Sequence, residues 1–163
     1  MSRWFKFIII SGLIVLLSGS YAINKSIRVF NFNEFEPLLH QTSDTIYFIN
    51  FWATWCVPCR EEIPAINELQ SKYQDQKFKI LLVSLDRPRQ IDSSLKPFIE
   101  QYNIRSEVVV LDDPDFNSWI DKVSSSWSGS IPATLIYHRD KRKFYEQSFT
   151  FNELDSILIH EFL

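Results

Sequence analysis

The two cysteines of this chain lie three positions apart, in Cys56-Val57-Pro58-Cys59. A disulfide between them would close a very short loop and would remove little conformational entropy from the unfolded chain. Such a bond would stabilise the fold weakly, and two cysteines are too few for the disulfide framework of a small secreted scaffold. The spacing therefore favours a pair that is used for chemistry.

The surroundings of the pair predict thiol–disulfide exchange. Cys56 falls at the start of a predicted helix, where unpaired backbone N–H groups and the helix dipole stabilise a thiolate. Because the thiolate is the attacking species in exchange, Cys56 is the candidate nucleophile. Cys59 lies one helical turn further on and is the candidate resolving residue, since it can attack a mixed disulfide and release the substrate. Pro58 keeps the turn between them tight.

Two other uses of the cysteine pair fit the sequence less well. Two thiolates supply half of a zinc site, but the three histidines, His40, His138 and His160, form no paired ligand motif that would complete it. No metal and no other cofactor are therefore predicted. Two inert core cysteines are the second alternative, which the position of the pair between a strand and a helix disfavours.

The elements that must position the cysteines alternate between strands and helices. Strands are predicted over 45–52, 78–85, 107–111, 133–138 and 143–149. Helices are predicted from Asn31, over 57–73, from an Asp92 cap to about Tyr102, from an Asp113 cap through Lys122, and from a capping box at Thr150. This order describes an α/β domain with helices on both faces of a sheet. It places Cys56 at the carboxyl end of a buried strand, where α/β ligand sites lie.

An apolar segment precedes this domain. Arg3 and Lys6 are followed by a run of apolar or small residues over 7–17, and residues 20 and 22 have the small side chains that a signal peptidase reads. Residues 1–22 are therefore predicted to be a signal peptide or a membrane anchor, with both alternatives open, and residues 25–163 to be one domain. The positive flank predicts that this domain is exported, to the periplasm or the extracytoplasmic face of the cytoplasmic membrane.

Composition excludes some classes of protein. The chain has 163 residues, of which 45% are hydrophobic and 23% charged, a balance typical of a globular domain. The net charge is −3, and no basic stripe is present that would neutralise phosphates. Binding to nucleic acid is therefore not expected.

The segment Phe51-Trp52-Ala53-Thr54-Trp55-Cys56-Val57-Pro58-Cys59 resembles the active-site segment of thioredoxins. In detail it is similar to the exported, often membrane-tethered reductases of the TlpA/ResA group. Pro64 matches the helix-kinking proline of thioredoxins, and the segment 131–134 matches their cis-proline loop. The resemblance covers about residues 45–163. It implies a thioredoxin fold, a central mixed sheet with helices on both faces, in which the helix and strand over 92–111 are an insertion.

The resemblance also implies roles around a substrate groove. Pro132 would be cis rather than a trans proline at a strand start. The backbone of Ile131 would then be free to pair with an incoming peptide. Trp55, beside Cys56, and Trp127, near the proline loop, would line the groove or, equally, belong to the core. The glycine that thioredoxins carry before the last helix is absent, and Glu146-Gln147-Ser148 in its place leaves substrate choice open.

A further implication concerns the proton acceptor. Thioredoxins carry a buried aspartate six residues before the first cysteine, and here that position is Asn50, which cannot take a proton. The TlpA/ResA group tends to have a glutamate three residues after the second cysteine, which corresponds to Glu62. Glu62 would then accept the proton of Cys59. The alternative is a solvated acid within the charged run 60–62.

These features together imply a thiol–disulfide oxidoreductase that reduces disulfides of exported proteins with electrons from a membrane partner. In this group the usual targets are apocytochromes that await haem attachment, as in cytochrome c maturation. A disulfide oxidase or isomerase stays open, because Val57-Pro58 tunes the reduction potential without fixing it. A non-catalytic peptide-binding module is disfavoured by the presence of both cysteines, and a peroxidase by their spacing.

Overall fold

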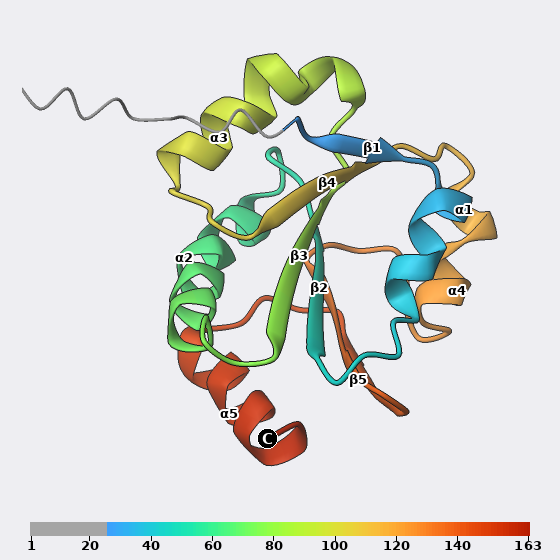
Figure 1. Ribbon diagram of the computed structural model, residues 1–163. Coiled ribbons are helices and arrows are strands. Elements are labelled where there is room, and N and C mark those ends of the chain that lie inside the picture. The colour runs from blue at the N-terminus through green and yellow to red at the C-terminus, as the bar shows by residue number, and fades with distance from the viewer. Residues whose placement is uncertain (1–25) are drawn as a thin grey trace, which may run out of the picture.

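The computed structural model describes residues 26–163, which form a mixed six-stranded sheet with helices on both faces (Figure 1). The strands are β1 (Arg28–Phe30), β2 (Ile46–Trp52), β3 (Phe78–Ser84), β4 (Glu107–Leu111), β5 (Ala133–His138) and β6 (Lys141–Tyr145). Their order in the sheet is β1-β4-β3-β2-β5-β6. The first four strands along the chain run parallel, and β5 pairs antiparallel with both β2 and β6. This arrangement is the α/β sandwich that the sequence predicted.

The helices form two layers. They are α1 (Phe32–Phe35), α2 (Val57–Lys72), α3 (Lys96–Gln101), α4 (Ile120–Val123) and α5 (Phe151–Glu161). Short 3₁₀ segments η1 (Glu36–Leu39), η2 (Pro88–Gln90) and η4 (Phe116–Ser118) and a π-helical turn η3 (Ile91–Leu95) join them. In Figure 1, α2, α3 and α5 lie on one side of the sheet and α1 and α4 on the other. The predicted signal peptide or anchor, residues 1–22, lies outside the described residues, and within 26–163 no helix has the length and apolar character to span a bilayer.

Strand β2 is buried on both faces, as its apolar sequence predicts. Phe48 and Trp52 belong to the core under α2 and α5, whereas Ile49 and Phe51 belong to the core under α1 and α4. This alternation follows from the two-residue period of a strand, which sends successive side chains to opposite faces. The segment that ends at Cys56 therefore begins from the most enclosed strand of the sheet.

Three of the five predicted helix starts are confirmed, and two are wrong. The helix predicted from residue 57 begins there, as α2. The capping boxes at Asn31 and Thr150 are both present. Asp92 instead lies inside the π-helical turn, where its carboxylate pairs with Lys96 at 2.6 Å. Asp113 is not the cap of the helix that follows it, because η4 begins after Asp115. Asp113 Oδ1 accepts the N–H of Asp115 at 3.1 Å, and its Oδ2 accepts the N–H of the distant Phe32 at 3.0 Å. The helix predicted through residue 122 is accordingly split into η4 and α4.

The two edge strands of the sheet also differ from the sequence prediction. β6 begins at Lys141 and not at 143, because the β5–β6 turn contains only Arg139 and Asp140. Arg139 adopts a φ of 55°, a left-handed conformation that tightens such a turn. β1 was not predicted, since three residues carry too little pattern for a strand to be recognised.

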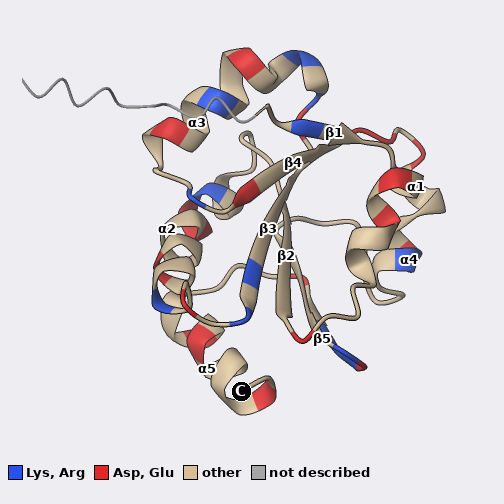
Figure 2. Cartoon of the chain, viewed as in Figure 1, with Lys and Arg blue, Asp and Glu red and all other residues tan. Residues whose placement is uncertain are grey.

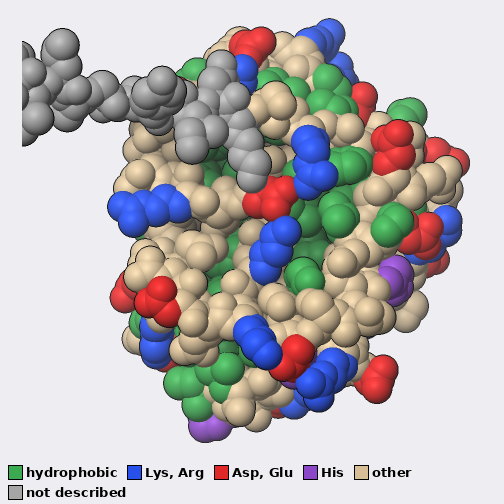
Figure 3. Space-filling model, viewed as in Figure 1, with side chains coloured by type: hydrophobic (Ala, Val, Ile, Leu, Met, Phe, Trp, Pro, Cys, Tyr) green, Lys and Arg blue, Asp and Glu red, His purple; other side chains and the backbone are tan. Residues whose placement is uncertain are grey.

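Charged side chains lie mainly on the helices and at the strand ends, and the central strands are mostly uncharged (Figure 2). An exception is Lys79 on β3, which pairs at 3.0 Å with Glu107, the first residue of β4; Glu107 also pairs with Arg28 at 2.6 Å. On the face seen in Figure 3, positive and negative side chains are interspersed. Exposed pairs of this kind contribute little to stability, and the core carries most of it.

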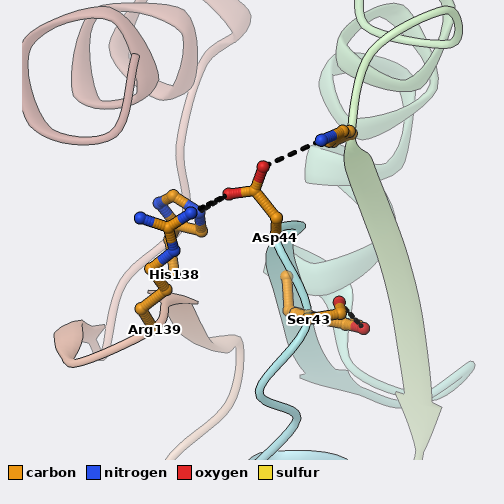
Figure 4. Close-up of polar contacts among 6 residues, drawn as sticks. Ser43, Asp44, His138 and Arg139 are labelled. Carbon is orange, nitrogen blue, oxygen red and sulfur yellow. Dashed lines mark hydrogen bonds and ion pairs between the residues drawn. The ribbon is translucent and has the colours of Figure 1, made fainter.

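The amino end of β2 is held by a cluster of charges around Asp44 (Figure 4). Asp44 Oδ2 accepts from Lys77 at 2.8 Å, and Oδ1 accepts from Arg139 at 2.6 Å and lies 3.1 Å from His138 Nε2. The hydrogen bond from Lys77, together with that from His138, holds the pKa of Asp44 well below its usual range. The cluster therefore joins the loop before β2 to the loop before β3 and to the β5–β6 turn.

Replacing Asp44 by asparagine is expected to destabilise the fold at neutral pH and to have less effect in acid. The folded pKa is depressed, so the stabilisation is complete above the unfolded value of about 4 and is lost as the pH falls through the folded value. Urea unfolding of Asp44→Asn and of the matched surface variant Asp140→Asn at pH 7 and pH 2 tests this. An Asp44→Asn deficit that is as large at pH 2 as at pH 7 would contradict it.

Candidate active site

Cys56 and Cys59 form a disulfide at the carboxyl end of β2, with 5.3 Å between their Cα atoms. Cys56 is the N-cap of α2 and has an extended backbone, and Cys59 lies in the first turn of that helix. The exposed fraction is 6% for Cys56 and 1% for Cys59. Cys56 is thus the more accessible sulfur, in keeping with its predicted role as the nucleophile.

The start of α2 supplies a hydrogen-bond donor to the first sulfur. The backbone N–H of Cys59 points to Cys56 Sγ, with 3.3 Å between nitrogen and sulfur. This N–H is one of those that a helix leaves unpaired in its first turn. When the disulfide opens, the same N–H and the helix dipole stabilise a thiolate on Cys56.

The proline loop lies against the disulfide, although 75 residues separate them in the sequence. The Ile131–Pro132 peptide bond is cis, as the resemblance implied. The carbonyl oxygen of Ile131 lies 3.6 Å from Cys56 Sγ. A disulfide sulfur carries no proton, so this contact becomes a hydrogen bond only when Cys56 is a thiol. The loop therefore forms one wall of the reacting site.

Glu62 is buried beneath the disulfide-bearing turn, with 2% of its surface exposed. It follows Cys59 by three residues on α2, which places both side chains on one face of the helix. Its Oε1 accepts the N–H of Phe149 at 3.1 Å, and its Oε2 accepts from Asn50 Nδ2 at 3.3 Å. Burial raises the pKa of Glu62 to about 7, against the opposing effect of these two hydrogen bonds. The alternative of a solvated acid is wrong, because the carboxyl group is enclosed.

Asn50 occupies the centre of this buried polar set. Its Nδ2 donates to Glu62 and also to Thr134 Oγ1, at 3.0 Å. Its Oδ1 has no hydrogen-bond partner within residues 26–163. Of the three side chains, only that of Glu62 ionises near neutral pH, so the substitution of asparagine for the thioredoxin aspartate leaves one proton-binding group in this set.

Asp86 is a site residue that the sequence analysis missed. It lies just beyond β3, is 1% exposed, and accepts from the Thr54 N–H at 3.0 Å, the Thr54 hydroxyl at 2.6 Å and the Ser84 hydroxyl at 2.7 Å. It therefore anchors the segment that leads from β2 to Cys56. A signal was available: an aspartate that directly follows a buried parallel strand lies at the same sheet edge as the cysteines.

The two candidate tryptophans are in different environments. Trp55 is 61% exposed beside Cys56, and Val57 and Pro58 on the other side of the sulfur are exposed as well. Trp127 is buried in the core under α1 and α4, where its ring centroid lies 4.7 Å from that of Phe51. The structure thus places Trp55 on an apolar surface around Cys56, and for Trp127 it supports the core alternative.

Comparison with known proteins agrees with this geometry. Residues 31–142 match the AhpC/TSA family. The thiol-disulfide oxidoreductase ResA of Bacillus thuringiensis is 38% identical over 63 residues, which are 39% of this chain and 35% of that protein. ResA of Geobacillus kaustophilus is 38% identical over 94 residues, 57% of this chain and 48% of that protein. The alignments thus span between about a third and a half of these relatives.

Solved structures share the fold. A DsbF homologue from Corynebacterium diphtheriae superimposes with a TM-score of 0.59 at 21% identity, covering 72% of this chain and 73% of that one. A secreted thiol-disulfide isomerase from Corynebacterium glutamicum gives 0.59 at 17% identity, covering 71% and 69%. At these identities the likeness establishes the thioredoxin-like architecture of the chain.

Proposed function

This chain belongs to the AhpC/TSA family, and from that premise we propose that it is a thiol–disulfide oxidoreductase that works through Cys56 and Cys59. The observation that carries the proposal is the disulfide at the start of α2, with the Ile131 carbonyl 3.6 Å from Cys56 Sγ. The ResA relatives are named thiol-disulfide oxidoreductases, which supports the proposal.

The reaction transfers two electrons in two exchange steps. In the reduced protein the Cys56 thiolate attacks a substrate disulfide, a Cys56–substrate bond forms, and one substrate thiolate leaves. Cys59 then attacks Cys56 Sγ, the mixed disulfide breaks, and the second substrate sulfur leaves as a thiolate that takes up a proton. The substrate is reduced to a dithiol, and the protein ends as the Cys56–Cys59 disulfide.

Glu62 supplies the base for the second step. Cys59 is buried and must lose its proton before it can attack, and a base is most effective when its pKa lies near the working pH. Glu62 meets this condition, because its pKa is raised to about 7 by burial. The carboxyl group therefore accepts the Cys59 proton without leaving the protein interior.

The substrate groove is formed by exposed apolar side chains and by the proline loop. Trp55, Val57 and Pro58 surround Cys56, and the backbone of Ile131 offers strand-like pairing to an extended peptide. We infer that the substrates are disulfides of exported proteins, with apocytochromes awaiting haem attachment as the first class to test. The predicted export segment favours a position of the domain on the extracytoplasmic side, where a membrane partner would deliver electrons.

The reduction potential of the full chain separates a reductase from an oxidase. A reductase is expected to have a potential near −270 mV or lower, close to thioredoxin, whereas a strong oxidant lies near −120 mV. Equilibration against dithiothreitol and glutathione buffers, followed by alkylation of free thiols, measures it. A reduction potential near that of the strong oxidant would reverse the proposed direction of electron transfer. The exchange chemistry of the two cysteines would still stand.

A further inference from the structure

Glu146, which directly follows β6, is bound to a loop that lies 16 to 18 residues earlier in the chain. Its Oε2 accepts the N–H of Ser128 at 3.0 Å, and its Oε1 accepts the N–H of Ser130 at 2.8 Å. The hydroxyl of Ser128 also donates to Oε1. One carboxylate thus receives three hydrogen bonds from two residues of the loop.

The same loop is held from the core side by Trp127. The indole N–H of Trp127 donates to the carbonyl oxygen of Ser130 at 2.8 Å. The indole itself is fixed among aromatic rings, since it is 3% exposed and lies against Phe51. Ser130 is therefore held at both of its backbone polar groups, its N–H by Glu146 and its carbonyl by Trp127.

The course of the loop between these anchors depends on Gly129. Its φ is +96°, a conformation that side-chain-bearing residues rarely adopt. A Cβ at this position would also lie 3.4 Å from Phe116 Cε1. The loop therefore has a defined shape over 127–130, and Ile131, whose carbonyl faces Cys56, is the residue that follows.

We propose that Glu146 is a positioning residue that fixes the Ile131 backbone for pairing with an extended polypeptide substrate. This inference rests on the proposed exchange activity and deepens it by naming the residue that orders the substrate-binding segment. Strand-like pairing needs donors and acceptors in one register, and a backbone that is already ordered avoids the cost of ordering it on binding. A small organic disulfide reacts at Cys56 without backbone pairing, so it does not need the anchored loop.

Glu146→Gln and Trp127→Phe in the full chain test the proposal. Glu146→Gln removes the charge and replaces one of the two acceptor oxygens by an amide donor, and Trp127→Phe removes the donor to the Ser130 carbonyl. Both variants retain most of the side-chain volume. We expect kcat/KM for an oxidised peptide with a Cys-x-x-Cys disulfide to fall about 10-fold, through KM. With 2-hydroxyethyl disulfide we expect less than a twofold change. Glu68→Gln, a change of the same kind at an exposed position of α2, is the matched control and should resemble wild type with both compounds.

The outcomes separate this inference from the proposed function. An equal loss with both disulfides, or a loss in kcat alone, would show that the anchors support the dithiol and not peptide binding. Wild-type rates for both variants on the peptide would overturn the positioning role while exchange activity stands. A wild-type protein that reduces neither compound would overturn both claims. Thermal melting of each variant establishes that the comparison is made on folded protein.

Discussion

Replacing Cys56 by serine is expected to reduce disulfide exchange on the order of 10³-fold or more, because the first attack needs its thiolate. Replacing Cys59 by serine should also stop turnover but should leave the first step intact. The Cys59→Ser protein is then expected to accumulate mixed disulfides through Cys56, since the residue that would break them is absent. Each variant is incubated with an oxidised peptide and the reaction is quenched with acid. Non-reducing electrophoresis and mass spectrometry then detect the mixed disulfides and distinguish the two variants.

The pair of variants also tests the roles of the two sulfurs against each other. Adducts are expected on Cys56 in Cys59→Ser and none on Cys59 in Cys56→Ser, because Cys59 is the less exposed sulfur and lies inside the first turn of α2. Equal adduct formation by both variants would reverse or abolish the assignment of nucleophile and resolving residue. The absence of adducts in both variants would favour a peptide-binding module.

Replacing Glu62 by glutamine is expected to slow release of the reduced substrate about 10²-fold at neutral pH. Glutamine fills the same space and cannot take a proton, so the mixed disulfide should persist. The wild-type rate profile should show an inflection near pH 7, where burial places the pKa of Glu62, and the variant should lack it. Glu61→Gln, an exposed neighbour on the same helix, is the matched control. A Glu62→Gln profile that superimposes on wild type would remove the proposed role.

The same variant should alter the pH dependence of stability in the oxidised protein. The folded pKa of Glu62, about 7, lies above the ordinary glutamate value, so the folded state binds the extra proton between the two. Wild-type stability attributable to this group therefore falls as the pH rises from about 4 to about 7, by about 3 kcal/mol at most. Glu62→Gln should flatten that part of a urea-unfolding profile.

Local patterns in the sequence predicted the central part of the fold. The apolar run over β2 and the helical spacing of apolar residues over α2 are strong patterns, because both elements are deeply buried. The cysteine pair could be assigned from type and spacing, and Pro132 and Glu62 from the family resemblance. Where a side chain capped a segment distant in sequence, as Asp113 does with the N–H of Phe32, the local pattern led to a wrong helix start.

The remainder of the site depends on contacts that no local pattern contains. Asp86 binds Thr54 across 32 residues, and Glu146 binds Ser128 across 18. The sequence could not assign Trp127 to the groove or to the core, because an aromatic residue near a loop is compatible with either location. Such assignments require the sheet order, which brings the ends of β2, β3 and β5 together.

The hydrogen bond between Phe149 and Glu62 spans 87 residues, and Phe149 lies just before α5. During synthesis the cysteines therefore leave the ribosome long before the segment that encloses Glu62. Until the segment from Phe149 through α5 docks, the carboxyl group lacks the burial that raises its pKa, so the proposed base is not yet matched to the chemistry of Cys59. On the proposed function, an emerging chain carries both thiols but is expected to exchange disulfides efficiently only once its final helix is in place.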